Sequence, residues 1–252
     1  MSPETRDALL ALNRRFYDAQ AEDFARTRPR PWRGSERVLN HIGAATPRVL
    51  DVGCGHARLL DALHARYGSA FHYIGVDASR ALLDLARERA RVAGIEVHLR
   101  YEDFVADDPE QVLPGGEYDL LALLGVLHHV PGDAARRALL AAAARRLGAQ
   151  GVLALTLWRL HTDPRFERRR VSTEQAAALT PELARAHAAL EPGDHLLWWG
   201  QGQKALRYCH FMDEAELERL LSGLPLSELA RFDDDGAGER MNTYVLLRRA
   251  AA

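Results

Sequence analysis

Short apolar runs alternate with amphipathic stretches through the middle of the chain. The apolar runs are typical of buried strands, and the stretches between them carry apolar residues at helical spacing. The pattern predicts strands at residues 48–51, 71–77, 95–101, 118–124 and 151–158, and helices at 57–67, 79–93 and 134–147. The strand at 118–124 is apolar almost throughout, which is typical of a sheet covered on both faces. Such alternation indicates a parallel α/β sheet.

The two ends of the chain and one internal stretch depart from this alternation. Helices are predicted at 4–25, through Val38 and Leu39, and at 213–221, and the last two strands at 226–232 and 242–248. Residues 159–205 are polar and irregular, and a stretch of this length does not easily form a core of its own. We therefore predict an N-terminal helical cap (1–46), a core (47–158), an insertion or lid (159–205) and a C-terminal completion of the sheet (206–252).

Composition narrows the class of protein. Hydrophobic residues make up 47% of the chain and charged residues 27%, with a net charge of −2, so we expect a globular protein without DNA as a partner. Cys54 and Cys209 are the only cysteines, which excludes a disulfide framework and predicts a cytoplasmic protein. The charged N-terminus is not typical of a signal peptide, and no apolar run reaches the roughly 20 residues that span a membrane.

The most informative segment, Asp51-Val52-Gly53-Cys54-Gly55, lies between a predicted strand and a predicted helix. The two glycines permit a tight turn and let a ligand lie against bare backbone. Three other segments follow neighbouring strands: Asp77-Ala78-Ser79, Glu102-Asp103-Phe104 and Leu124-Gly125. Ligands bind at the carboxyl ends of strands in open α/β sheets, so these segments predict one binding site.

Two ligands that contain adenosine are candidates for this site. The fingerprint of a nicotinamide dinucleotide requires a third glycine where Arg58 stands, and a pyrophosphate would be repelled by Asp51. The cationic amino acid end of S-adenosylmethionine would instead be attracted to Asp51. Asp77 is placed to accept both ribose hydroxyls, and Asp103 and Phe104 to contact adenine. Taken singly, the three acids also have structural interpretations as a helix cap, a turn residue and a solvated loop acid.

Residues 48–158 resemble the class I S-adenosylmethionine methyltransferases, in Val-Leu-Asp-Val-Gly-Cys-Gly, Gly-Val-Asp-Ala-Ser and Gly-Val-Leu-His-His-Val. The resemblance implies a Rossmann-like sheet of seven strands, mostly parallel with one antiparallel strand, and helices on both faces. It implies S-adenosyl-L-methionine as the cofactor, with the glycines at its methionine part. The predicted cofactor site comprises Tyr17, Arg28, Asp51, Gly53, Gly55, Asp77, Ala78, Ser79, Glu102, Asp103, Phe104, Leu124 and Gly125.

The ends of the chain are similar to the tRNA wobble-uridine carboxymethyl methyltransferases, which esterify 5-carboxymethyluridine. The similarity lies in Phe16-Tyr17-Asp18, Phe24, Thr27-Arg28, Pro31-Trp32 and Arg207-Tyr208-Cys209-His210-Phe211, with Cys209 in place of an aromatic residue. It extends only loosely to the insertion, which would form part of the acceptor site. It implies tRNA as the methyl acceptor and is compatible with a small activating protein partner. A small-molecule acceptor and a non-catalytic cofactor-binding subunit are the alternatives.

The chemistry of methyl transfer indicates which residues could bind or activate the methyl acceptor. A carboxylate acceptor is already nucleophilic and requires a cationic clamp, for which Arg28, Arg207 and His210 are candidates. A hydroxyl or amine acceptor would require a base, for which His129 beside His128 is a candidate, with packing as the alternative. The predicted catalytic residues are His129, Arg207 and His210, and the predicted acceptor contacts are Trp32, Trp158 and Tyr208.

Two arginine-rich stretches bear on the question of an RNA acceptor. Residues 14–37 and 159–170 each carry a net charge of +3, which suits either RNA phosphates or a solvated surface. Cys209, His210, His195 and His161 have poor spacing for zinc, so we expect no metal.

Overall fold

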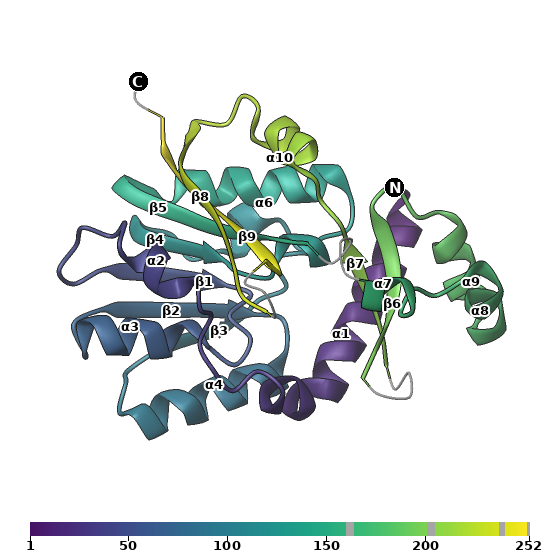
Figure 1. The fold of residues 1–252 in the computed structure, drawn as a ribbon, viewed down its shortest axis with the longest axis horizontal. Coiled ribbons are helices and arrows are strands. Elements are labelled where there is room, and N and C mark those ends of the chain that lie inside the picture. Colours follow the sequence, from purple (N-terminus) through teal and green to yellow (C-terminus); the bar gives the residue numbers. More distant parts are fainter. Residues whose placement is uncertain (160–163, 201–204, 237–239, 251–252) are drawn as a thin grey trace.

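The computed structural model describes residues 1–159, 164–200, 205–236 and 240–250. Its centre is a seven-stranded sheet in the order β3-β2-β1-β4-β5-β9-β8 (Figure 1). The strands are β1 (Arg48–Val52), β2 (His72–Asp77), β3 (His98–Tyr101), β4 (Tyr118–Leu123), β5 (Leu147–Trp158), β8 (Leu226–Asp234) and β9 (Asn242–Arg249). Strands β1 to β5 pair in parallel, and β9 runs antiparallel to both β5 and β8. The predicted fold class is confirmed.

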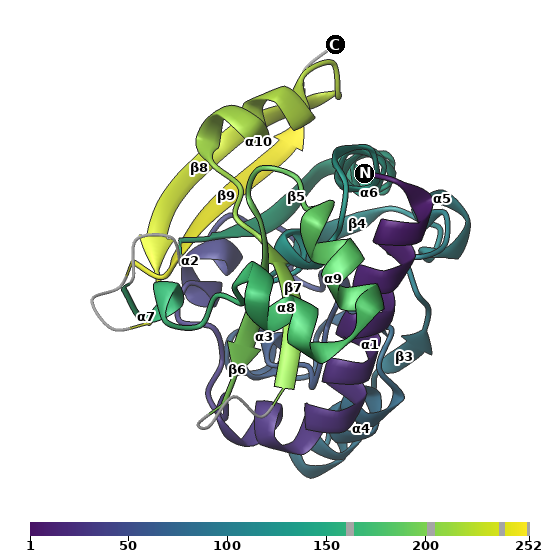
Figure 2. The ribbon, with the colours of Figure 1, turned by 90° about the vertical axis from the view of Figure 1, so that its right-hand side faces the viewer.

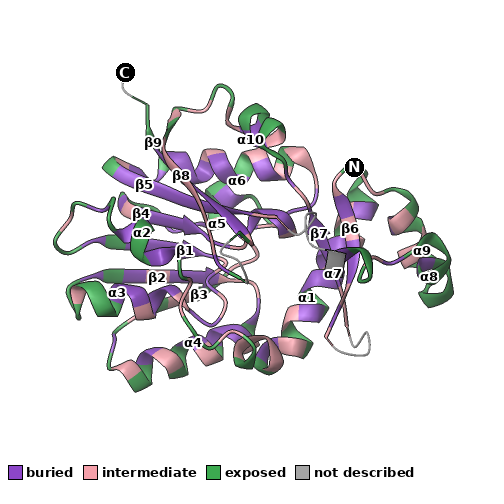
Figure 3. Cartoon of the chain, in the orientation of Figure 1, coloured by how far each residue is buried: buried purple, intermediate pink, exposed green. Residues whose placement is uncertain are grey.

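Helices cover both faces of this sheet. One face carries α2 (Ser35–Leu39), α3 (Leu59–Tyr67) and α4 (Arg80–Ala93), and the other carries α5 (Pro109–Val112), α6 (Asp133–Arg145) and α10 (Glu214–Leu221). Leu120 and Leu121 are both fully buried although their side chains point to opposite faces, which explains the apolar run in β4 (Figure 3). None of the described helices is long and apolar enough to cross a membrane.

A cap lies over the carboxyl ends of the strands (Figure 2). It contains α1 (Pro3–Arg26), α7 (Pro164–Glu167), α8 (Thr173–Leu179), α9 (Pro181–Ala188) and the hairpin of β6 (Asp194–Trp199) and β7 (Ala205–His210). Leu9 and Leu12 of α1 pack with Leu196 and Tyr208 of the hairpin in a separate apolar cluster. Helix α1 of the predicted N-terminal cap therefore forms one layer with the predicted insertion, whereas α2, which was assigned to the same cap, lies on a face of the sheet.

Two predictions about the insertion were wrong. Residues 159–205 were predicted to be irregular, but their described part contains three helices and β6. Residues 206–210 were assigned to the completed sheet, but they belong to β7 and pair with β6 in the cap. Each of these elements is too short to show a sustained periodicity of apolar residues in the sequence. Their buried apolar residues pack against α1, which is distant in the sequence.

Candidate functional site

A cavity of about 960 Å³ lies between the carboxyl ends of the strands and the cap. The core contributes the turn after β1, residues 77–79, residues 103–105, and the segment that leads from β4 into η1 (Leu127–His129). The cap contributes α1, the segment that follows it, and parts of β6 and β7. Every predicted cofactor residue except Glu102 lines this cavity.

The turn after β1 presents bare backbone to the cavity. Gly53 and Gly55 have φ angles of 70° and 55°, a region that favours glycine. A Cβ at Gly53 would lie 2.6 Å from Cγ2 of Val126, whereas a Cβ at Gly55 would meet no atom within 4 Å. Gly53 therefore allows close packing beneath the turn, and Gly55 leaves its surface open to a ligand.

Asp77 is held in place by the same turn. Its Oδ2 accepts a hydrogen bond of 2.7 Å from the backbone N–H of Gly55, and its Oδ1 accepts one of 2.9 Å from that of Ser79. Each carboxylate oxygen can accept a further bond, so two adjacent hydroxyl groups could bind here. Burial raises the pKa of Asp77 to about 6.

Two further acids complete the core side of the cavity. Asp51 is buried at the end of β1, accepts a 2.7 Å hydrogen bond from the hydroxyl of Tyr73, and has its pKa raised to about 7 by burial. Asp103 accepts a hydrogen bond from the backbone of Ala106 through Oδ1, while its Oδ2 makes no hydrogen bond but lies 3.4 Å from Nη1 of Arg14, with which it forms an ion pair. With Phe104 beside Asp103, these residues offer a site for a cation next to a site for a polar planar ring.

The cap brings two guanidinium groups to the other side of the cavity. Arg207 is only 4% exposed and lies over the rings of Phe16 and Trp158, at 5.5 and 4.8 Å from their centroids. Among the described residues no carboxylate pairs with it, and its Nε is buried without a hydrogen bond. Arg28 likewise pairs with no described carboxylate, and burial together with Arg207 lowers its pKa to about 10. The cavity can therefore take up anionic groups.

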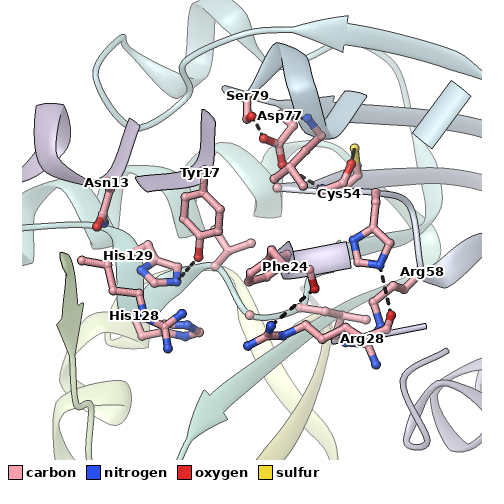
Figure 4. A pocket seen from close by; sticks show the side chains of 18 of the residues that line it. Asn13, Tyr17, Phe24, Arg28, Cys54, Arg58, Asp77, Ser79, His128 and His129 are labelled. Carbon is pink, nitrogen blue, oxygen red and sulfur yellow. Dashed lines mark hydrogen bonds between the residues drawn. The ribbon is translucent and has the colours of Figure 1, made fainter. Parts of the chain in front are cut away.

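His129 is fixed in one tautomer by its two partners. Its Nδ1 lies 3.0 Å from the backbone carbonyl of Tyr208, which can only accept, so Nδ1 carries the proton. Nε2 then accepts a 2.6 Å hydrogen bond from the hydroxyl of Tyr17, and Figure 4 shows the two side chains pointing toward each other. Burial and Arg207 lower the pKa of His129 to about 3. This histidine is a neutral hydrogen-bond acceptor.

Three predicted site residues lie outside the cavity. Tyr208 is fully buried and donates its hydroxyl to Asp194, and His210 lies between Asp194 and Glu216, at 2.8 Å from each. Tyr208 and His210 therefore join the two strands of the hairpin to each other and the hairpin to α10, and they do not line the cavity. Glu102 pairs with Arg100 at the sheet edge.

The cavity also contains residues that the sequence did not indicate as site residues. His56 and Arg58 line the cavity. They directly follow the glycine turn, and this position in the sequence is the signal that could have identified them as site residues. Phe24, from the resemblance, and Trp199 line the cap side, together with the predicted Trp32 and Trp158. The described residues contain no group of three or more metal-binding side chains, and His161 lies outside them.

Comparison with known proteins adds to this geometry. Residues 49–151 match the family model described as "Methyltransferase domain". The chain contains a methyltransferase domain. A ubiquinone biosynthesis O-methyltransferase from Xylella fastidiosa (strain 9a5c) is 36% identical over 104 residues, which cover 38% of this chain and 39% of that protein. A tRNA (carboxymethyluridine(34)-5-O)-methyltransferase from Xenopus tropicalis is 28% identical over 152 residues, which cover 59% of this chain and 21% of that protein.

Solved structures are similar over most of the chain. A SAM-dependent methyltransferase from Methanosarcina mazei aligns over 85% of this chain and 98% of its own, with a TM-score of 0.63 and 15% identity. Magnesium protoporphyrin IX methyltransferase from Synechocystis PCC 6803 with bound SAM aligns over 99% of both chains, with a TM-score of 0.60 and 14% identity. The chain spans about two fifths of the first curated relatives that it matches. For the methyltransferase domain, the predicted class I fold, activity class and S-adenosylmethionine cofactor are confirmed.

Proposed function

We propose that the whole protein is an S-adenosylmethionine-dependent methyltransferase whose acceptor is a carboxylate. The observation that carries this proposal is the buried Arg207, which lines the cavity without a carboxylate partner among the described residues. A guanidinium fork binds both oxygens of a carboxylate and orients it without protonating it. A carboxylate acceptor therefore needs positioning and no base.

The core residues fit the cofactor. When bound, S-adenosylmethionine supplies a methyl group on a sulfonium centre that a nucleophile can attack. Asp51 and the backbone at Gly55 would hold its cationic amino acid end, Asp77 its ribose hydroxyls, and Asp103 with Phe104 its adenine. Arg28, which follows α1 beside the glycine turn, would bind the cofactor carboxylate, and Arg207 then remains for the acceptor.

A hydroxyl acceptor is the second candidate, because Tyr17 and His129 form a hydrogen-bonded pair in the cavity wall. Its base would be His129, whose pKa of about 3 makes it a weak proton acceptor near neutral pH. The same geometry suits a different role, in which His129 orients Tyr17. The carboxylate is therefore favoured.

A modified nucleoside in tRNA is the acceptor that we favour among carboxylates. Arg26, Arg30, Arg33 and Arg169 are exposed at the edge of the cavity, where they could contact phosphates. The tRNA methyltransferase from Xenopus tropicalis has the longest aligned segment of the two curated relatives described above. A small-molecule carboxylic acid is the alternative.

The test is transfer of tritium from labelled cofactor to separated tRNA and metabolite fractions of a cell extract. We expect label in tRNA, released as volatile methanol by mild alkali because a methyl ester is hydrolysed and a methyl ether is not. Activity on tRNA should fall steeply with salt. Alkali-stable label would exclude a carboxylate acceptor, label in metabolites would exclude tRNA, and saturable binding of S-adenosylhomocysteine without transfer would indicate a binding subunit.

Cofactor affinity should depend on pH through Asp51. Its pKa of about 7 means that it is protonated below pH 7 and loses its attraction for the ligand's ammonium group. We expect affinity for S-adenosylhomocysteine to fall about tenfold or more between pH 8 and pH 5. His56 and His129 stay neutral throughout, since their pKa values are lowered to about 4 and 3.

Calorimetry over this pH range checks the prediction. Asp51→Asn, which keeps an acceptor for Tyr73, should bind more weakly at pH 8 and show a flatter profile. The pH dependence of affinity that remains in this variant should come from Asp77, whose pKa is about 6. Equal pH profiles for the variant and the parent would contradict the role of Asp51.

A further inference from the structure

Residues 28–32, here called the strap, connect α1 to α2 and run along one wall of the cavity. Arg28, Arg30, Pro31 and Trp32 of the strap all line the cavity. Two prolines prevent this segment from continuing α1 and deprive it of two backbone donors. Its position must therefore be set by contacts with other parts of the chain.

Two side chains that follow the glycine turn hold the strap by its carbonyl groups. Nε2 of His56 lies 3.1 Å from the carbonyl oxygen of Arg28, and because a carbonyl only accepts, Nε2 donates. Nε of Arg58 donates to the carbonyl of Arg30 at 2.7 Å. The Arg58 guanidinium also lies 4.3 Å from the ring centroid of Trp32.

The residue between them is in an unfavourable backbone conformation. Ala57 is fully buried and has a φ angle of 57°, a left-handed conformation that is unfavourable for a residue with a Cβ. The flanking His56 and Arg58 both contact the strap from this short turn. Backbone strain that the surrounding contacts maintain is a frequent feature of functional sites.

We infer that His56 and Arg58 are positioning residues that hold the strap against the glycine turn, so that Arg28 meets the amino acid end of the cofactor. The inference rests on the cofactor assignment in the proposed function. It assigns His56 a role through Arg28, since its Nε2–H is already engaged by the strap. Loss of this hydrogen bond should therefore weaken recognition of the amino acid end and leave the nucleoside end unaffected.

Two ligands distinguish recognition of the amino acid end from recognition of the nucleoside end. S-adenosylhomocysteine has the amino acid end, whereas 5′-methylthioadenosine has the same nucleoside and thioether without it. By calorimetry, His56→Ala should bind S-adenosylhomocysteine about 3- to 10-fold more weakly, the loss of one hydrogen bond, with unchanged affinity for 5′-methylthioadenosine. His56→Gln, which keeps an N–H donor at similar reach, should restore most of the difference. Substitution of the exposed His72 by alanine is the matched control.

Arg58→Lys provides a second test, because it keeps the charge in the cavity but loses the planar fork and the contact with Trp32. It should show the same selective loss, and amide hydrogen exchange in residues 28–32 should be faster in both His56→Ala and Arg58→Lys. Equal weakening of both ligands, or no weakening in either variant, would overturn the inference. Failure of the parent protein to bind either ligand would instead overturn the proposed cofactor site.

Discussion

Asp77→Ala should reduce affinity for S-adenosylhomocysteine about 10- to 100-fold, the loss of one or two hydrogen bonds to a charged group. The carboxylate is the group placed for the ribose hydroxyls, and it also holds the N–H groups of Gly55 and Ser79. Its removal therefore takes away ligand contacts and loosens the turn that receives the ligand. Calorimetry at pH 8, where the pKa of about 6 leaves Asp77 charged, measures the effect.

The control for this substitution is Asp84→Ala on the exposed surface of α4. Asp84 pairs with the exposed Arg87 and does not line the cavity. The Asp84→Ala variant should bind S-adenosylhomocysteine with the same affinity as the parent protein. Unchanged affinity in Asp77→Ala, with the fold verified by circular dichroism, would show that the ribose is bound elsewhere.

Arg207→Met should lower methyl transfer to the acceptor about 100-fold or more while leaving affinity for S-adenosylhomocysteine nearly unchanged. Two charge-assisted hydrogen bonds to a carboxylate account for an effect of this size. Arg207→Lys keeps the positive charge without the guanidinium fork, and its rate of methyl transfer should lie between those of the parent protein and of Arg207→Met. The measurement is label transfer to the fraction that the parent protein methylates.

The same substitution should make the protein more stable. In the described part of the structure Arg207 is a buried cation without an anionic partner, and such a group is costly to desolvate. We expect Arg207→Met to raise the free energy of unfolding by about 1 kcal/mol or more, as is typical of residues retained for function at the expense of stability. Denaturant unfolding tests this, and a destabilised, fully active Arg207→Met would indicate a packing role.

The core of the fold was predictable because its signals are local. The runs that became β1 and β4 are buried on both faces, and Gly53, Gly55 and Asp77 lie where such strands end. The cap was not predictable in the same way. Its hairpin is stabilised by α1, whose Asn13 accepts a hydrogen bond from the backbone of Tyr208 across 195 residues.

The errors in the site have the same origin. His210 was a candidate for the cationic clamp, because its partners, Asp194 and Glu216, come from a different strand and from a helix and do not show in the local sequence. Glu216 lies in the first turn of α10, where its backbone N–H donates to the capping Asp213 while its side chain reaches His210 and Arg136. Arg207 was placed correctly in the cavity, but its lack of a described partner could be seen only in three dimensions.

The contact between Asn13 and Tyr208 has a consequence for how the protein is made. During synthesis α1 leaves the ribosome before β7, because Tyr208 lies 195 residues after Asn13 in the chain. Until the hairpin has emerged, Leu9 and Leu12 of α1 lack their partners Leu196 and Tyr208 and are available to chaperones or to other nascent chains. Strands β1 to β5 precede the hairpin in the chain, so they can begin to pair before the cap closes the cavity, whereas β8 and β9 join the sheet only after the hairpin has emerged.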